Sequence, residues 1–146
     1  MTLRIKNKYV LSLARWLANL SLSGQESRNR TKFVEALSEQ EKENEEMRLE
    51  ILKKYAEVDE ETKELKMVEE NGAKHYVIPD EDTAKFTKEF TDYIDQDFIM
   101  EGEGLKTRLT MVSSIVLNTT EKIVPELATD YDKWCEAFEA MLAENK

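Results

Sequence analysis

Near the N-terminus, apolar residues change from alternating to helical spacing. Leu3 and Ile5 alternate with polar residues, which predicts a short edge strand that ends at Asn7, a side chain suited to cap a helix. An apolar face with helical spacing follows directly. Its residues are Val10, Leu13, Leu17 and Leu20, with Tyr9 and Trp16 beside them. We expect this first helix to lie with that face on the core.

A second, much longer helix is predicted from Ser23 to about Val58. Ser23 and Glu26 have the spacing of a capping box, and nothing between them and Val58 breaks a helix. Its apolar stripe is interrupted by Gln40 and Asn44. The stripe consists of Phe33, Val34, Leu37, Met47, Ile51 and Tyr55. Polar residues in such a seam fix the register of a helix pair. The sequence leaves two alternatives open, a solvated helix beyond Glu39 and a helix-to-helix interface.

The clearest local pattern is a β-hairpin at residues 65–78, after a turn at residues 59–63. Asn71-Gly72 separates two alternating runs, and this pair favours a type I′ turn. Counting outward from the turn gives three cross-strand pairs on one face. They are Glu69 with Lys74, Met67 with Tyr76, and Leu65 with Ile78. Beyond the ion pair that face is apolar, so we expect it to cover the core.

Helical spacing returns in the C-terminal half. Pro79 ends the hairpin, and Asp80 or Asp82 is expected to cap a third helix with Phe86, Phe90, Tyr93 and Ile94 on one side. Residues 98–100 predict another short strand, and residues 105–117 fit either a helix or a strand. Pro125 suits the first turn of a last helix. Its stripe is Leu127, Tyr131, Trp134, Phe138 and Met141.

These elements predict an α+β fold that is mainly α, with a long charged helix and further helices packed on a small antiparallel sheet. The length suits one domain of common size, and two prolines and four glycines leave little room for a linker. We therefore expect a single domain over residues 1–146. Within it, residues 1–58 would hold the first strand and two helices, and residues 59–146 the hairpin and the C-terminal helices.

Charge is divided unevenly along the chain. The first 32 residues sum to +6 and the remainder to −16, which gives the chain a net charge of −10. Such polarity favours a macromolecular partner. Apolar residues reach 40% and charged residues 36%, yet no segment is apolar for long enough to span a membrane. We expect no membrane association.

Residue patterns that carry catalysis are missing. The sequence has no glycine-rich phosphate loop, no nucleophile elbow and no His-Glu-x-x-His pair. His75 has no second histidine or cysteine near it in the sequence, and Cys135 lies among the apolar residues of the last helix. We read His75 as a surface or structural residue and Cys135 as a buried thiol. The sequence thus predicts no enzyme, no catalytic residue, no metal site and no cofactor.

A basic cluster and an acidic stretch are the candidate partner-binding residues. Arg28, Arg30 and Lys32 lie in the first turns of the long helix, where the helix dipole disfavours cations. Either an acid within the chain or an acidic protein partner would compensate them. The acidic candidates are Glu39, Glu43, Glu46 and Glu50, with Asn44 in the adjacent seam. The acidic body makes direct nucleic-acid binding improbable.

Association is a second expectation from the long helix. Its interrupted stripe, together with complementary charge at the terminus and in the body, predicts a homo-oligomer. A dimer is the simplest form because closed two-fold pairing is the commonest.

Several segments resemble a family of uncharacterised small acidic proteins from tailed phages and prophages of Gram-positive bacteria. The segments are Ile5-Lys6-Asn7, residues 20–32, residues 55–59, residues 115–118 and residues 131–135. The resemblance implies a phage origin and a late gene near tail and lysis functions, in the host cytoplasm or the virion. It brings no catalytic residues with it.

Two functions follow as expectations. The first is a non-enzymatic phage protein that acts by protein–protein interaction, as a small virion or tail-assembly component or a late accessory protein. The alternative is an inhibitor of a host defence or nucleic-acid-binding protein, in which clustered carboxylates imitate phosphates.

Overall fold

A computed structural model describes residues 1–144, and they form the expected α+β fold that is mainly α. The chain divides into two compact units. Unit 1 combines Met1–Lys42 with the chain from Asp95 onward, and unit 2 is Glu43–Ile94. These limits differ from the boundary expected at residue 58, because the long helix α2 (Gly24–Tyr55) contributes residues to both units. A compact unit need not fold alone, so the single domain stays a prediction.

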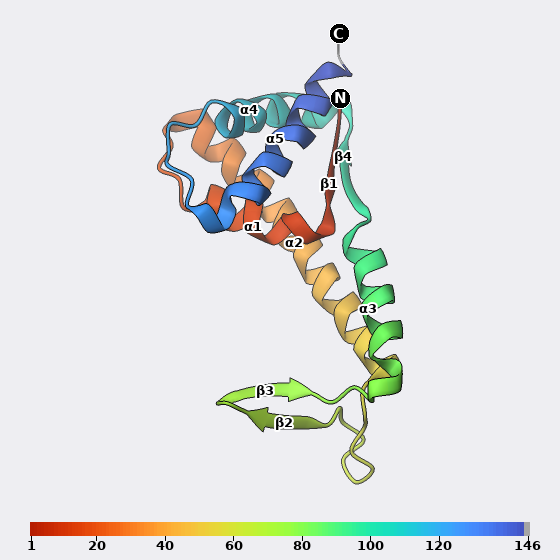
Figure 1. The fold of residues 1–146 in the computed structure, drawn as a ribbon. Coiled ribbons are helices and arrows are strands. Elements are labelled where there is room, and N and C mark those ends of the chain that lie inside the picture. Colours follow the sequence, from red (N-terminus) through yellow and green to blue (C-terminus); the bar gives the residue numbers. More distant parts are fainter. Residues whose placement is uncertain (145–146) are drawn as a thin grey trace. The chain divides into compact units, whose positions relative to one another are not determined.

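A two-stranded antiparallel sheet lies along one side of unit 1 (Figure 1). Strand β1 (Thr2–Lys6) pairs with β4 (Asp97–Glu101), so that Ile5 lies opposite Phe98. Leu3 and Ile5 are buried and the residues between them are exposed, as the alternation predicted. The pairing itself joins segments almost a hundred positions apart in the sequence.

Asn7 is not the helix cap that the sequence predicted. Helix α1 (Asn7–Ala18) has Lys6 at its N-cap position, without a side-chain cap bond. The Asn7 N–H donates to the Gln96 carbonyl at 2.9 Å and so extends the strand ladder into the helix start. The Asn7 side chain is buried, and its Oδ1 accepts a hydrogen bond from Gln40 Nε2 at 3.2 Å. Asn7 therefore joins a strand, a helix start and α2 within unit 1.

The core of unit 1 lies between its sheet and its helices, which include α4 (Lys106–Leu117) and α5 (Ala128–Ala143). Short 3₁₀ turns at Glu103–Leu105 and Pro125–Leu127 precede these two helices. Phe33 and Phe138 have their ring centroids 6.2 Å apart, and Trp16 lies 5.6 Å from Trp134. The stripe of the last helix is thus confirmed as a core face.

Residues 106–117 form a helix, which resolves the alternative left open between helix and strand. The β-branched side chains do not prevent the helix, because their helical spacing buries them: Val112, Ile115 and Val116 all lie in the core. Tertiary packing thus outweighs the local preference for a strand.

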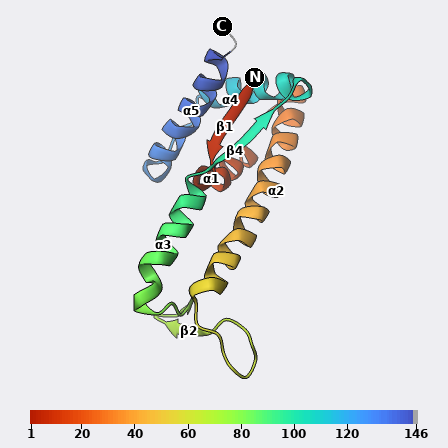
Figure 2. The same cartoon turned by 90° about the vertical axis from the view of Figure 1, so that its right-hand side faces the viewer.

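Unit 2 contains the second part of α2, helix α3 (Asp80–Ile94) and a β-hairpin of β2 (Met67–Glu70) and β3 (Ala73–Tyr76). Within this unit the two helical segments run side by side, and the hairpin follows their ends (Figure 2). Its buried apolar residues are few. They are Ile51, Leu52 and Ala56.

The predicted hairpin turn and register are confirmed. Met67 lies opposite Tyr76 and Glu69 opposite Lys74. Asn71 and Gly72 have positive φ angles of 51° and 79°, as a type I′ turn requires.

Two expectations for the hairpin are wrong. Leu65 pairs with Val58 instead of Ile78. The backbone N–H of Glu57 donates to the Val77 carbonyl, and the Glu57 carbonyl accepts from the Lys66 N–H. These bonds place the segment after α2 beside the hairpin. The hairpin also does not cover the core, since every residue of β2 is exposed. Strands of four residues are too short to build a buried face there.

Candidate interaction surfaces

Arg30 of the predicted basic cluster is a structural residue. Its guanidinium Nη1 donates to the Leu17 carbonyl at 2.7 Å and to the Leu20 carbonyl at 2.6 Å. Leu17 lies in the last turn of α1 and Leu20 just after its end, where the helix dipole is negative, and the Leu17 carbonyl also accepts the Leu20 N–H at 3.2 Å. The cation at the start of α2 is therefore compensated within unit 1 by the end of α1.

Arg28 and Lys32 remain at the surface. Lys32 pairs with Glu35 at 3.5 Å, and both side chains are more than half exposed. Such an exposed pair contributes little free energy. Arg28 is exposed as well. The three cations thus do not form one binding patch.

The acidic candidates are exposed, as predicted, but Asn44 is not. Glu39 is exposed on the unit 1 part of α2, and Glu43, Glu46 and Glu50 are exposed on the unit 2 part. Asn44 is buried, and its Oδ1 accepts a hydrogen bond from the Tyr93 hydroxyl at 2.7 Å. Asn44 therefore holds α3 against α2 and is not available to a partner.

Within unit 2, helix α3 covers the predicted seam of α2. The Tyr55 hydroxyl donates to Glu89 Oε1, and Lys54 Nζ lies 3.1 Å from Glu89 Oε2. The hydrogen bond from Tyr55, followed by that from Lys54, holds the pKa of Glu89 below its usual value. The helix-to-helix interface is thus formed inside the chain in this unit.

An open groove of about 470 Å³ lies beside the hairpin in unit 2. It is lined by Leu49, Lys53, Val58, Lys63, Glu64, Leu65, Met67 and Tyr76. Three large apolar side chains are unusually accessible at this end of the unit: Val58 is 47%, Met67 48% and Val68 44% exposed. Val58 and Met67 line the groove, whereas Val68 follows Met67 directly in β2 and so lies on the other face of the hairpin. Exposed apolar surface can mark interaction sites.

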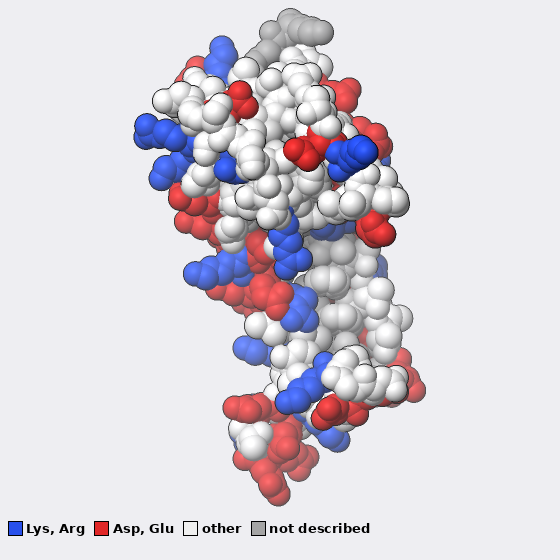
Figure 3. Space-filling model, turned by 90° about the vertical axis from the view of Figure 1, so that its left-hand side faces the viewer, with Lys and Arg blue, Asp and Glu red and all other residues white. Residues whose placement is uncertain are grey.

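The groove lies in the more acidic of the two units, although its own charged lining residues are Lys53, Lys63 and Glu64. Unit 2 holds sixteen acids against eight bases, so it carries −8 of the net charge of −10. The acids gather over the hairpin end of the unit (Figure 3). Seven of them lie between the end of α2 and the hairpin turn: Glu57, Asp59, Glu60, Glu61, Glu64, Glu69 and Glu70.

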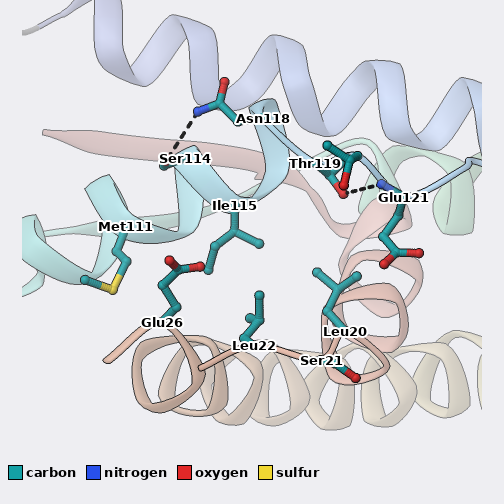
Figure 4. A pocket seen from close by; sticks show the side chains of 11 residues that line it. Leu20, Ser21, Leu22, Glu26, Met111, Ser114, Ile115, Asn118, Thr119 and Glu121 are labelled. Carbon is teal, nitrogen blue, oxygen red and sulfur yellow. Dashed lines mark hydrogen bonds between the residues drawn. The ribbon is translucent and has the colours of Figure 1, made fainter. Parts of the chain in front are cut away.

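Unit 1 has a hollow of about 410 Å³ between the α1–α2 connection and the end of α4 (Figure 4). Leu20, Leu22 and Ile115 form its apolar part. Its polar groups largely bond one another, since Asn118 Nδ2 donates to Ser114 Oγ and the Glu121 N–H donates to Thr119 Oγ1, each at 3.1 Å. Neither histidine nor cysteine lines it.

His75 and Cys135 lie apart from these hollows. His75 is exposed on β3 opposite Val68. Cys135 is half-buried on α5, and this burial raises the pKa of its thiol and lowers its reactivity. Burial also raises the pKa of the neighbouring Tyr131 to about 12, and its hydroxyl donates to the Val116 carbonyl at 2.8 Å.

Residues 1–144 contain no group of three or more histidine, cysteine or acidic side chains able to hold a metal ion. In the same part of the chain, no helix combines the length and hydrophobicity that a membrane span requires. Sequence reasoning missed the exposure of Val58 and Met67. The alternation of Leu65 and Met67 with polar residues resembles that of a strand face on a core, so only the fold could place Met67 outside it.

No protein-family model matches the chain, and searches among curated proteins and among solved structures found no significant match. The resemblance to phage proteins therefore stays untested, and the surfaces themselves carry the argument on function.

Proposed function

We propose that this chain is a non-enzymatic protein that acts by binding another protein, with unit 2 as its contact surface. One observation carries the proposal. The apolar groove at the hairpin lies among the residues that carry most of the net negative charge of the chain.

This combination defines the chemistry of the partner. A two-stranded hairpin in water is marginally stable, and Val58, Met67 and Val68 would gain free energy from cover by another apolar surface. The surrounding carboxylates would attract a basic rim around that surface and accelerate encounter at low salt. The partner surface is therefore an apolar patch bordered by lysine and arginine.

The biological setting rests on the sequence resemblance alone. That resemblance implies a phage origin, and we propose a small virion or tail-assembly component or a late accessory protein, in the host cytoplasm or the virion. Detecting the protein by mass spectrometry in purified virions supports the structural role, and its absence there favours the accessory role.

The alternative is an inhibitor that occupies the basic groove of a host defence or nucleic-acid-binding protein. Glu43, Glu46 and Glu50 favour it, because they are exposed at helical spacing on one part of α2. This function requires carboxylates but no apolar contact. Substituting the three glutamates by glutamine would abolish inhibition, whereas removing the apolar side chains of the groove would not.

The test of the leading proposal compares three tagged proteins in capture experiments from infected cells. The first is wild type, the second carries Val58→Thr, Met67→Thr and Val68→Thr, and the control carries Ile99→Thr and Val124→Thr. Ile99 and Val124 are equally exposed but lie in unit 1. We expect one partner that wild type and control capture and the unit 2 variant loses. Capture of the same partner by the unit 2 variant with unchanged yield would contradict the proposal.

A homo-oligomer remains part of the proposal, with a dimer as its simplest form. Because α3 covers the seam of α2 within unit 2, self-association would have to use another surface, such as the apolar hairpin end. Sedimentation of wild type and of the threonine variant of unit 2 tests this. A wild-type dimer that the variant converts to a monomer supports it, and a wild-type monomer removes it.

A further inference from the structure

One edge of strand β1 is free to accept another strand. In an antiparallel ladder, alternate residues direct their N–H and C=O groups to the same neighbour. Asn7 donates to Gln96 on the β4 side, so Ile5 and Leu3, two and four positions earlier, also face β4. The N–H and C=O groups of Thr2 and Arg4 and the N–H of Lys6 therefore point to the opposite edge. Within residues 1–144, no backbone hydrogen bond outside the regular elements involves these three residues.

A groove lies beside the second half of β1, with residues of α5 on its other side and Asp97 of β4 at its border. It measures about 500 Å³ and is lined by Arg4, Ile5, Lys6, Lys8, Tyr9, Asp97, Lys133, Glu136 and Ala137. Both ribbon views show β4 on one side of β1 and α5 running along the other (Figures 1 and 2). The small side chain of Ala137 on α5 leaves room at the groove wall. An extended segment in this groove would add a third strand to the sheet.

The charged residues that line the groove indicate what kind of segment could bind there. Arg4 and Lys6 project from the solvent face of β1, and Lys8 and Lys133 bring the cations of the lining to four, against two carboxylates. Arg4, Lys8 and Lys133 have exposed ion pairs with Glu144, Asp95 and Glu136, which contribute little and exchange readily. Lys6 has no ion pair within residues 1–144.

A second copy of this chain is a poor occupant. Antiparallel pairing of two β1 edges about Arg4 would set Arg4 against Arg4 and bring the Lys6 side chains beside Thr2 of the other copy. Like charges directly opposite each other destabilise a strand pair, and cations on an edge strand are a common protection against self-association. The cations on the β1 edge therefore disfavour pairing with a second copy of β1 and favour a strand that carries carboxylates.

We propose that the β1 edge binds an extended acidic segment of a partner protein, which adds to the sheet as a third strand. Carboxylates at alternate positions of the segment would lie opposite Arg4 and Lys6. The intervening apolar side chains would enter the groove beside Tyr9 and Ala137. This surface uses unit 1 only and is independent of the function proposed for unit 2.

The first test is hydrogen exchange of backbone amides in the free protein, measured by NMR. The Ile5 amide bonds to β4 and is expected to exchange at least tenfold more slowly than the amides of Arg4 and Lys6. Equal protection of Arg4 and Ile5 would show that the edge is already occupied and would overturn the proposal.

The second test uses three capped hexapeptides as probes: alternating Glu and Val, alternating Lys and Val, and the Glu-Val peptide N-methylated at every second residue so that one edge cannot donate. We expect the Glu-Val peptide to cause saturable shifts at Arg4, Lys6, Lys133 and Ala137, with at least tenfold weaker binding of the other two. A variant with Arg4→Glu and Lys6→Glu, checked for a wild-type melting temperature, should prefer the Lys-Val peptide.

Three results would overturn the proposal. They are an absence of saturable shifts at the β1 edge, equal binding of the N-methylated peptide, and shifts confined to unit 2. Failure here leaves the function proposed for unit 2 intact, because that function is read out through Val58, Met67 and Val68.

Discussion

Unit 1 and unit 2 differ in how many apolar residues they bury and in how much net charge they carry. Sixteen buried apolar residues form the core of unit 1, whereas only three are buried in unit 2. Unit 1 carries a net charge of −2 and unit 2, with little more than half as many residues, −8. Stability depends chiefly on buried apolar area, so unit 1 supplies it, and unit 2 exposes the groups that a partner would contact.

The contacts that hold unit 2 together are mostly polar. Asn44 with Tyr93, and Tyr55 and Lys54 with Glu89, join its helices. Each net hydrogen bond contributes only about 1 kcal/mol, so a unit of this kind opens more easily than a packed core. Its two helices and hairpin are therefore suited to adjust to a partner.

The largest expected effect comes from one substitution made in both units. Phe33 is fully buried against Phe138, so Phe33→Ala should lower the free energy of unfolding by about 3 to 5 kcal/mol. Phe90 is half-buried and stacks on Phe86 at 5.9 Å, so Phe90→Ala should cost only about 1 to 2 kcal/mol. Urea denaturation measures both. Equal costs would break the comparison between the units.

The second effect concerns Arg30, the cation that unit 1 uses internally. Arg30→Gln removes two charge-assisted bonds, to the carbonyls of Leu17 and Leu20, and should cost about 1.5 to 3 kcal/mol. Arg28→Gln, two residues earlier in α2 and exposed, should stay within about 0.5 kcal/mol of wild type. Thermal melting of both variants measures the two losses of stability. A large loss for the Arg28 variant would indicate a stabilising contact of Arg28 that the fold does not show.

The third effect is local to the hairpin of unit 2. Gly72 has φ of 79° with no atom within 4 Å of an added Cβ, so Gly72→Val should cost about 1 to 3 kcal/mol through backbone strain alone. Gly104 has equal space but no positive φ, so Gly104→Val is the control. Cross-strand NMR contacts between Val68 and His75 report the loss. Intact contacts in the Gly72 variant would contradict the role of the turn.

The smallest effect is a response of unit 2 to acid. The pKa of Glu89 is held below its ordinary value of 4.5 by Tyr55 and then Lys54. A lowered folded pKa means that this stabilisation is fully present above 4.5 and is lost as the pH falls through the folded value. Amide exchange in α3 should therefore accelerate as the pH is lowered below 4.5, after correction for intrinsic rates. The variant Glu89→Gln should lose this dependence, and an unchanged profile would exclude the contact as its cause.

Local patterns predicted much of this fold. The Asn71-Gly72 turn and its register, the long helix and the stripe of the last helix depend on residues close in sequence, and the structure confirms all three. The pairing of β1 with β4 and the bonds from Arg30 to α1 depend on how distant segments pack. A single sequence contains no direct signal for such contacts.

The candidate surfaces show the same limit. Exposure of Glu43, Glu46 and Glu50 follows from a charge-rich helix, and it was predicted. The burial of Asn44 was not predicted, because its inward position depends on Tyr93, which belongs to a helix far along the chain. Alternation likewise could not show that Met67 faces solvent, since the same pattern describes a strand on a core.

Native-state hydrogen exchange of the isolated protein tests the central claim most directly. If unit 1 supplies the stability, the core amides of α1, α4 and α5 exchange only through global unfolding, and their opening free energy falls with denaturant at the slope of the whole molecule. The amides of α3, β2 and β3 should open with a lower free energy and a shallower slope. If unit 2 amides instead share the opening free energy and slope of the unit 1 core, the two regions form one cooperative structure and the account is contradicted.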